Sequence, residues 1–414
     1  MTARALVIGA GVAGPVAAMA LQKAGLDVVV YEAHPEPADE VGAFLTLQVN
    51  GVHALRAIDA DRVVDGLGFP TPVMRFRSGT GKPLGEVELT AAHSDGPVSV
   101  TLRRADLYRA LCDEAVRRGI RIEYGRRLRD AHPVHGGVRA EFADGSVVTG
   151  DVLVGADGVR SRVRHIIDPA AAPARYVPML NIGGYAPPQD TGAPPGAYEM
   201  VFGKRAFFGY AVAPDGEIWW FANPPRRDEP APGELAAMTT EQWRTWLLEL
   251  FADDRSPACT IIASTPGELT GWAVYDVPSV RHWHRDGMVI IGDAAHATSP
   301  SSGQGASLAI EDAVELGRCL RDLPDPTTAF AAYEHLRRSR VEQVVALGAR
   351  TSSTKVAGPV ARVLRDLFMP IFVRKTGTAA QRQLYDYRID WSAPVAADPA
   401  VLAAVSKAPT SMNG

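Results

Sequence analysis

The chain has 414 residues, too many for one ordinary hydrophobic core, so we expect two or three domains. With 46% hydrophobic and 22% charged residues, it matches soluble globular proteins and differs from disordered or fibrous ones. Its 43 basic and 47 acidic side chains give a net charge of −4. That balance argues against nucleic acid as a partner, because such binding depends on neutralising phosphates.

Cysteine usage and hydrophobic runs indicate the compartment. The three cysteines lie far apart without a CxxC pair, which argues against a disulfide framework or a metal site and favours reduced thiols. An apolar run from Ala5 to Leu21 follows Arg4 like a signal peptide, but glycines interrupt it at fixed spacing. No other stretch approaches the roughly 18 apolar residues of a membrane span. We therefore expect a cytoplasmic protein with no stable membrane association.

The first 31 residues predict a strand, a glycine turn, a helix and a second strand. Gly9, Gly11 and Gly14 form a GxGxxG motif in this context, which is typical of dinucleotide binding. The first glycine permits a tight turn, the second lets a pyrophosphate approach the backbone, and the third lets the helix pack on the strand. Val12 and Ala13 complete the predicted phosphate site, where the helix N-terminus attracts negative charge.

Glu32 closes the second predicted strand. A carboxylate at this place can accept hydrogen bonds from both hydroxyls of an adenosine ribose, and it would repel the 2′-phosphate of NADP. The alternative is a solvated acid at a strand end. The motif leaves NAD and FAD both open, because the two share the same ADP half.

Two later segments also join a buried strand to a turn. The first runs from Asp151 into Asp157-Gly158 and continues to Ser161 and Arg164. The second begins at residue 287, and its marks are Gly292, Asp293, Pro300, Gly303, Gln304 and Gly305.

With the three motifs in this order, the chain resembles the class A FAD-dependent monooxygenases, the p-hydroxybenzoate hydroxylase type of flavoprotein aromatic hydroxylase, over roughly residues 4–340. The resemblance implies an α/β fold: an FAD-binding Rossmann-like domain of the GR2 type, with an inserted β-sheet substrate domain and a C-terminal helical segment. The implied boundaries are 1–69, 100–174 and 277–325 for the FAD-binding domain, 70–99 and 175–276 for the substrate domain, and 326–414 for the C-terminal helices and tail.

The resemblance also assigns roles around FAD. It implies that Asp293 holds the ribityl chain, that Gly303-Gln304-Gly305 brings backbone close to the isoalloxazine ring, and that Pro300 borders that ring. The dipole of the helix after these glycines would stabilise the charge of the reduced flavin. Asp293 could instead be a helix cap.

Further cofactor contacts follow from the same resemblance. Arg104 is the expected ligand of the FAD phosphates or ribityl chain, with the adjacent Arg103 as the alternative. The backbone of Leu128 is expected to meet the adenine. Asp157 belongs to the cofactor cleft by resemblance, or is equally a turn-forming residue. His296 is either a base or, as we expect, a structural histidine.

The inserted segments are rich in short strands separated by turn residues. A period of two places Arg205 and Phe207 on one face, and Trp219 and Phe221 together on the next strand. By resemblance we expect these four residues and Pro300 to line the substrate pocket. Alternatively, the aromatic rings only pack the sheet against helices. We find no Ser-His-Asp or HExxH pattern, so no protein catalytic residue and no metal ligand is assigned.

The C-terminal part is predicted to be helical from Pro326. We expect the arginines of its first helix, such as Arg337, to form a solvated, ion-paired face. The amphipathic stretch Val356–Arg374 could contact a membrane or a partner, but we expect it to pack across the flavin domain.

Together these features predict a single-component flavin monooxygenase. NADPH or NADH would reduce FAD transiently, O₂ would form a flavin C4a-hydroperoxide, and one oxygen atom would enter an aromatic, polycyclic or polyketide-like small molecule. Hydroxylation, epoxidation and Baeyer-Villiger insertion all stay open. The rivals are a flavin halogenase or reductase on the same fold, and a dinucleotide-binding sensor that oxygenates nothing. We expect a monomer or homodimer.

Overall fold

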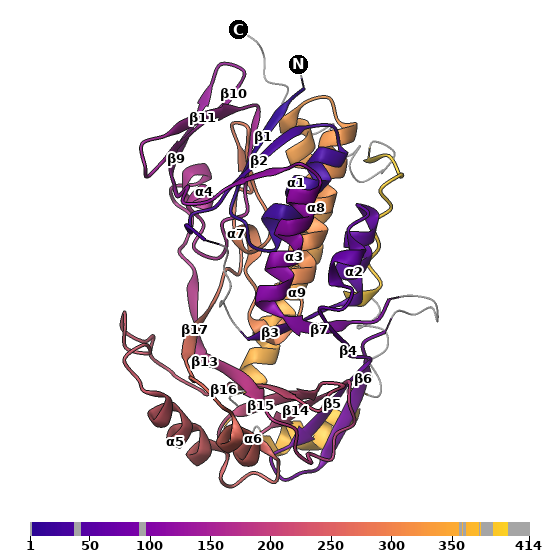
Figure 1. Cartoon of the computed structure of the whole chain (residues 1–414), viewed down its shortest axis with the longest axis vertical. Helices are drawn as coiled ribbons and strands as arrows, with labels where there is room; N and C mark the ends of the chain where they lie inside the picture. The colour runs from indigo at the N-terminus through magenta and orange to yellow at the C-terminus, as the bar shows by residue number, and fades with distance from the viewer. Residues whose placement is uncertain are drawn as a thin grey trace.

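The computed structural model describes residues 2–36, 43–90, 97–355, 358, 362–371, 373 and 384–395. Two large sheets lie at opposite ends of an elongated molecule, and long helices run between them (Figure 1). After the roles that the sequence predicts for them, we refer to the two ends as the flavin half and the substrate sheet.

The flavin half is built on a six-stranded sheet. Its core strands are hydrophobic runs buried on both faces, as expected of a parallel sheet covered by helices. All neighbours pair in parallel except the edge strand β18. In spatial order the strands are β18 (His284–Arg285), β19 (Met288–Ile290), β12 (Val152–Gly155), β1 (Arg4–Ile8), β2 (Asp27–Tyr31) and β8 (Arg121–Glu123).

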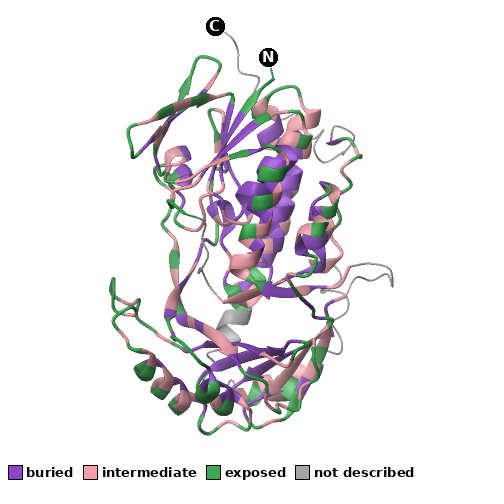
Figure 2. Ribbon diagram, in the orientation of Figure 1, coloured by how far each residue is buried: buried purple, intermediate pink, exposed green. Residues whose placement is uncertain are grey.

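Helices cover this sheet, and two of them, α1 (Ala13–Lys23) and α8 (Gly305–Asp322), are mostly buried (Figure 2). α1 packs along α8 so closely that a Cβ on Gly317 would lie 2.9 Å from the Cβ of Ala20. The helices of this half are α1 (Ala13–Lys23), α2 (Val49–Ala57), α3 (Arg104–Arg117), α4 (Arg162–Ile167), α7 (Asp293–His296), α8 (Gly305–Asp322) and α9 (Pro326–Lys355). Two short 3-10 helices are η1 (Asp61–Val64) and η2 (Pro300–Ser302).

Two small antiparallel sheets complete the flavin half. One is formed by β9 (Leu128–Val134), β10 (Gly137–Phe142) and β11 (Val147–Gly150). The other is formed by β3 (Phe44–Leu47), β7 (Val100–Arg103) and β4 (Gly68–Pro70), and it lies between the helices and the substrate sheet.

The substrate sheet has seven strands drawn from two separate parts of the chain. In spatial order they are β17 (Gly271–Asp276), β13 (Arg175–Ala186), β16 (Ile218–Asn223), β15 (Phe207–Val212), β14 (Ala197–Phe202), β5 (Val73–Ser78) and β6 (Pro83–Glu88). Every one of these strands lies within residues 70–99 or 175–276. This architecture confirms the expected α/β fold with an inserted β-sheet domain.

The two faces of the substrate sheet pack differently. Helices α5 (Thr240–Phe251) and α6 (Ala258–Ser264) cover the outer face, where Phe208 and Trp220 are fully buried beside Trp243. The inner face looks toward the flavin half, and its side chains pack with Phe44 and Phe69 from the small sheet between. The outer face is therefore a closed core, and the inner face is the surface shared by the two halves.

The chain after Pro326 belongs to both halves. Helix α9 leaves the flavin half and ends against the substrate sheet. Residues 384–395 return to the flavin half, where the Tyr387 hydroxyl donates to Glu315 over 2.9 Å and the Val395 N–H donates to Asp322 over 2.8 Å.

Residues 362–371 of the predicted stretch Val356–Arg374 pack against the substrate sheet, so the expectation that the stretch crosses the flavin domain is wrong for these residues. Phe372 and residues 356, 357, 359–361 and 374 lie outside the described residues. Lys82 Nζ donates to the Asp366 carbonyl over 3.1 Å, and the Arg365 guanidinium lies 4.6 Å from the centre of the Phe202 ring. The apolar residues predicted to drive packing are exposed instead, with Leu367 at 56% and Phe368 at 57%.

Within the described helices, none combines the length and hydrophobicity required to cross a membrane.

Candidate active site

The glycine turn after β1 has the geometry that each of its glycines predicts. Gly9 has a φ of +104°, and a Cβ there would lie 2.5 Å from the Ala156 carbonyl oxygen. A Cβ on Gly14 would lie 1.8 Å from the Gly9 carbonyl oxygen. A Cβ on Gly11 would meet nothing within 4 Å. Two glycines are therefore required by packing, while the third leaves open space beside the N-terminus of α1, where the first N–H groups lack helical acceptors.

Glu32 is tied to this turn rather than solvated at a strand end. Its carboxylate accepts a hydrogen bond from the Ala10 N–H over 2.7 Å and another from the His34 N–H over 2.8 Å. Because an ionised carboxylate offers about four acceptor positions, two stay available for ribose hydroxyls. Ribose binding by Glu32 stays a prediction.

The second motif caps a helix and connects two parts of the site. Asp157 accepts hydrogen bonds from the Ser161 hydroxyl over 2.5 Å and from the Arg162 N–H over 2.7 Å, at the N-terminus of α4. These bonds favour the turn-forming role for its side chain. The buried Arg164 donates to the Ala294 carbonyl over 2.9 Å, so this arginine ties the second motif to the third.

Asp293 begins α7, and its carboxylate takes part in none of the hydrogen bonds of the described residues. Burial raises its pKa, while the neighbouring His296 and Arg104 act to lower it. Arg104 thus lies close to Asp293, and its Nε donates to the Tyr108 hydroxyl over 2.6 Å. The arrangement leaves an acceptor free for a ligand hydroxyl, which is what a ribityl site requires.

Arg103, the alternative to Arg104, points to the substrate sheet. Its guanidinium lies 4.4 Å from the centre of the Tyr185 ring and donates to Glu217 over 3.1 Å. The geometry therefore favours Arg104 as the cofactor ligand of the pair, and that role stays a prediction.

The loop before α8 leaves its backbone open on one side. Gly303 has a φ of +61°, which favours glycine, and a Cβ on Gly303 or Gly305 would meet its nearest atom at 3.7 Å. Gln304 is buried, and its side-chain oxygen accepts from Asn50 over 2.9 Å. Pro300 is exposed. Close approach of a flat ring would thus involve the backbone of this loop and not the Gln304 side chain.

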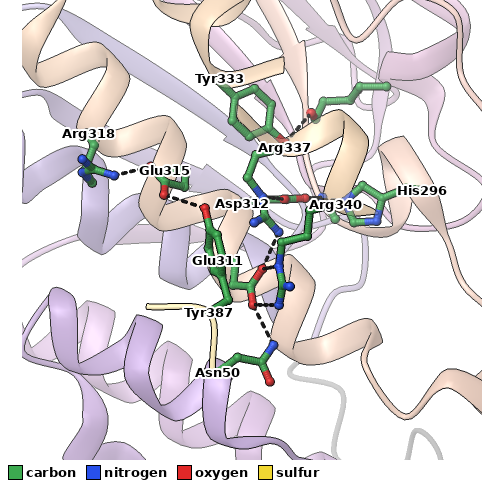
Figure 3. A network of polar contacts seen from close by, with 12 residues as sticks. Asn50, His296, Glu311, Asp312, Glu315, Arg318, Tyr333, Arg337, Arg340 and Tyr387 are labelled. Atoms are coloured by element: carbon green, nitrogen blue, oxygen red, sulfur yellow. Dashed lines mark hydrogen bonds and ion pairs between the residues drawn. The ribbon is translucent and has the colours of Figure 1, made fainter. Parts of the chain in front are cut away.

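Behind this loop lies a buried network of charges (Figure 3). Asp312 of α8 forms a hydrogen bond with His296, accepts from the Gly292 N–H over 2.9 Å, and pairs with Arg337 of α9 over 2.7 Å. Burial raises the pKa of Asp312, but His296 and Arg337 outweigh it and hold that pKa at about 2. These contacts favour the structural role for His296, which stays a prediction.

Arg337 corrects the expectation of a solvated arginine face on α9. Its side chain is fully buried and pairs with Glu311 over 2.6 Å as well as with Asp312. Arg340 also pairs with Glu311, over 2.8 Å. The sequence pattern showed arginines at helical spacing but could not show that two carboxylates of α8 face them.

Leu128 begins β9 and is buried, and it pairs across the ladder with Phe142. Its predicted contact with adenine stays a prediction.

Three of the five predicted pocket residues meet on the inner face of the substrate sheet. The pocket role of Pro300, which lies on the loop before α8, stays a prediction. The Phe221 ring lies 5.9 Å from that of Phe207, and both Phe221 and Trp219 lie within 6.3 Å of Phe44. Arg205 does not join them. It lies on the exposed hairpin turn before β15 and pairs with Asp253 over 2.6 Å, because the strand, with its period of two, begins only at Phe207.

Sequence reasoning missed other inner-face residues. Tyr198, Tyr185 and Lys355 are buried or half-buried beside the predicted rings, and Phe44 reaches them from β3. The sequence could have indicated Tyr198 and Tyr185, since each alternates along its strand with residues of the outer face. Lys355 gave no local signal.

Comparison with known proteins agrees with this arrangement. Residues 2–347 match the family model described as FAD binding domain. The FAD-dependent urate hydroxylase of Klebsiella pneumoniae is 30% identical over 345 residues, which cover 83% of this chain and 88% of that protein. The aurachin C monooxygenase/isomerase of Stigmatella aurantiaca is 28% identical, over 82% of this chain and 86% of its own.

A solved structure extends the similarity to three dimensions. HpxO of Klebsiella pneumoniae, complexed with FAD and uric acid, superimposes with a TM-score of 0.81 and 26% identity, covering 93% of this chain and 96% of that one. The chain therefore belongs to the FAD-binding-domain family of flavoprotein aromatic hydroxylases, and it is an enzyme whose cofactor is FAD.

Proposed function

We propose that this protein is a single-component monooxygenase that consumes NADPH or NADH and adds one atom of O₂ to a flat, aromatic or polycyclic small molecule. The observation that carries the proposal is the convergence of three distant motifs beside an aromatic sheet face. Arg164 joins the second motif to the third, and the Gly9 turn packs on Ala156 next to Asp157.

The residues present fit FAD in several independent ways. Open space at Gly11 beside the start of α1 suits a pyrophosphate, and the unused Asp293 carboxylate suits ribityl hydroxyls. Glu32 has acceptor positions left for the ribose. The open backbone of Gly303 and Gly305 suits the flat ring. When bound, FAD would supply hydride acceptance and oxygen activation, which no side chain supplies.

The chain itself would bind, orient and keep water out. The N-terminus of α8 would stabilise negative charge on the reduced ring. The inner face, with Phe207, Trp219 and Phe221, would hold a flat substrate by stacking and exclude water from the oxygen-transfer step. The buried network around Asp312 would hold the loop that carries Gly303 in one position.

The experiment measures, in the purified holoenzyme, how much of the consumed NAD(P)H and O₂ yields oxygenated product and how much yields H₂O₂. NADPH or NADH oxidation, O₂ uptake and H₂O₂ release are followed with uric acid, 6-hydroxynicotinate, a 4-quinolone and 2-naphthoate in turn. We expect at least one compound to accelerate oxidation, to release less H₂O₂ than the NAD(P)H consumed, and to gain one oxygen atom. Release of all electrons as H₂O₂ with every compound would contradict the proposal.

A further inference from the structure

Lys355 is a buried amine at the end of α9. Its Nζ donates to the Asn223 side-chain oxygen over 2.8 Å and lies 4.0 Å from the centre of the Phe207 ring and 5.4 Å from that of Phe221. The residue is 7% exposed. Within the described residues, no carboxylate forms an ion pair with it.

An unpaired amine is costly to bury, since lysine is almost never buried without a partner. Burial alone lowers the pKa of Lys355 to about 7. The groups that face it are the Phe207 ring of β15 and the Phe221 ring and Asn223 amide of β16, none of which titrates. Two ring faces and one amide oxygen solvate the ammonium only partly. Among the described residues, the positive charge therefore has no negative partner.

The position of Lys355 relative to the cofactor loop is fixed by its own helix. Two turns earlier, a Cβ on Gly348 would lie 2.8 Å from the Thr298 hydroxyl and 3.1 Å from the Ser302 Cβ, on the loop that carries Pro300 and Gly303. Seven residues of α-helix advance about 10 Å. Helix α9 therefore places the Cα of Lys355 about 10 Å along its axis from that of Gly348, which packs on this loop, and its amine reaches the inner face.

We propose that Lys355 is a substrate-binding residue, and that the substrate is a flat ring bearing an anionic oxygen, which pairs with its Nζ while the ring lies against Phe207 and Phe221. This inference rests on the proposed function, which brings an aromatic substrate to the inner face. A carboxylate arrives already ionised and meets the ammonium. An acidic ring hydroxyl transfers its proton to the neutral amine, and the same ammonium–oxyanion pair forms. Both sources share one chemistry.

The test measures binding to the holoenzyme by titration calorimetry with two matched pairs of probes. 2-Naphthoate is compared with 2-naphthalenemethanol, and pentafluorophenol with pentafluoroanisole, so that the carboxylate and hydroxyl sources are read separately. The variant is Lys355→Met, which keeps an unbranched side chain one heavy atom shorter and removes the charge. The control is Lys204→Met, which removes an exposed lysine bonded to the Asp253 carbonyl.

We expect at least one acid to bind the wild type about ten-fold or more tightly than its neutral counterpart, since the desolvated ion pair is made only with the acid. Lys355→Met should lose this preference, and Lys204→Met should keep it. An acid preference that survives Lys355→Met, equal binding of acids and neutral probes, or no binding of either acid overturns the assignment.

A second measurement needs no variant. In the protein without ligand, burial lowers the pKa of the Lys355 amine to about 7. Since 2-naphthoate binds the ammonium form, its affinity for the wild type should fall about ten-fold for each pH unit above that value. Flat affinity from pH 6 to pH 9 overturns the assignment. The FAD content and NADPH oxidation of the same preparation without ligand test the proposed function separately, so either idea can fail alone.

Discussion

The proposed binding surfaces of the flavin half and the substrate sheet are built from different parts of the chain: backbone in the first and side chains in the second. In the flavin half the backbone packs so closely that a Cβ on Gly14 would lie 1.8 Å from the Gly9 carbonyl oxygen, and a fully buried set of charges lies behind the site. On the substrate sheet, side chains shape the inner face, with aromatic rings at alternating positions of the strands and one amine that reaches them from the end of α9. A site made by backbone leaves a spaced motif in the sequence, and a site made by side chains on a sheet does not.

The largest effect should come from the buried charges of the flavin half. Arg337→Met leaves Glu311 and Asp312 each short of a buried partner, and breaking such a pair costs about 3–5 kcal/mol of unfolding free energy. Arg117→Met, the control, removes an exposed pair with Glu114 on α3 and should cost far less. Urea unfolding of both variants measures the difference, and equal losses would refute a special role for the buried network.

Two substitutions in the glycine turn separate the effect of packing from the effect of cofactor binding. Gly14→Ala forces a clash with backbone and should destabilise the protein without FAD by about 3 kcal/mol. The added methyl group of Gly11→Ala meets no protein atom, so the melting temperature without FAD should stay unchanged. Because this methyl group occupies the space predicted for the pyrophosphate, FAD affinity should fall about ten-fold or more. Thermal melts and FAD titration test both. Full FAD affinity in Gly11→Ala would show that the pyrophosphate lies elsewhere.

Substitutions of two aspartates in the later motifs should also separate cofactor binding from stability. Asp293→Ala removes a carboxylate with no described hydrogen bond, so FAD occupancy should drop about ten-fold with little change in stability. Asp157→Ala removes the cap of α4 and should cost about 1 kcal/mol. Flavin absorbance after purification gives the occupancy, and denaturant unfolding gives the stability. Tightly retained FAD in Asp293→Ala would mean that the ribityl site is misplaced.

The smallest effect on ligand binding should distinguish the two faces of the substrate sheet. Phe208→Leu alters the outer core and should cost about 1–1.5 kcal/mol of stability with an unchanged KM. Phe221→Leu alters a half-buried inner-face ring and should raise KM for an accepted substrate several-fold, with a smaller stability loss. Steady-state kinetics beside thermal melts give both readings. Identical profiles for the two variants would mean that the inner face is only core.

The same division explains what could be predicted from the sequence. The glycine turn, the Asp157–Arg164 segment and the loop at Gly303 were found because each needs particular residues at fixed spacing. The pairing of Arg337 with Asp312 was missed, since helical periodicity does not identify the opposing helix. Arg205 was misassigned because a strand boundary one or two residues later removes it from the alternation. The role of Lys355 could not be predicted from the sequence, because its partners on β15 and β16 lie more than a hundred residues away in the chain.

The central claim is that three separated motifs build one FAD site. The most direct measurement is the visible spectrum and flavin content of the purified wild-type protein, before and after incubation with FAD and removal of the excess. We predict flavin absorption bands and one FAD for each chain. A protein that shows no flavin band even after incubation with FAD would contradict the claim.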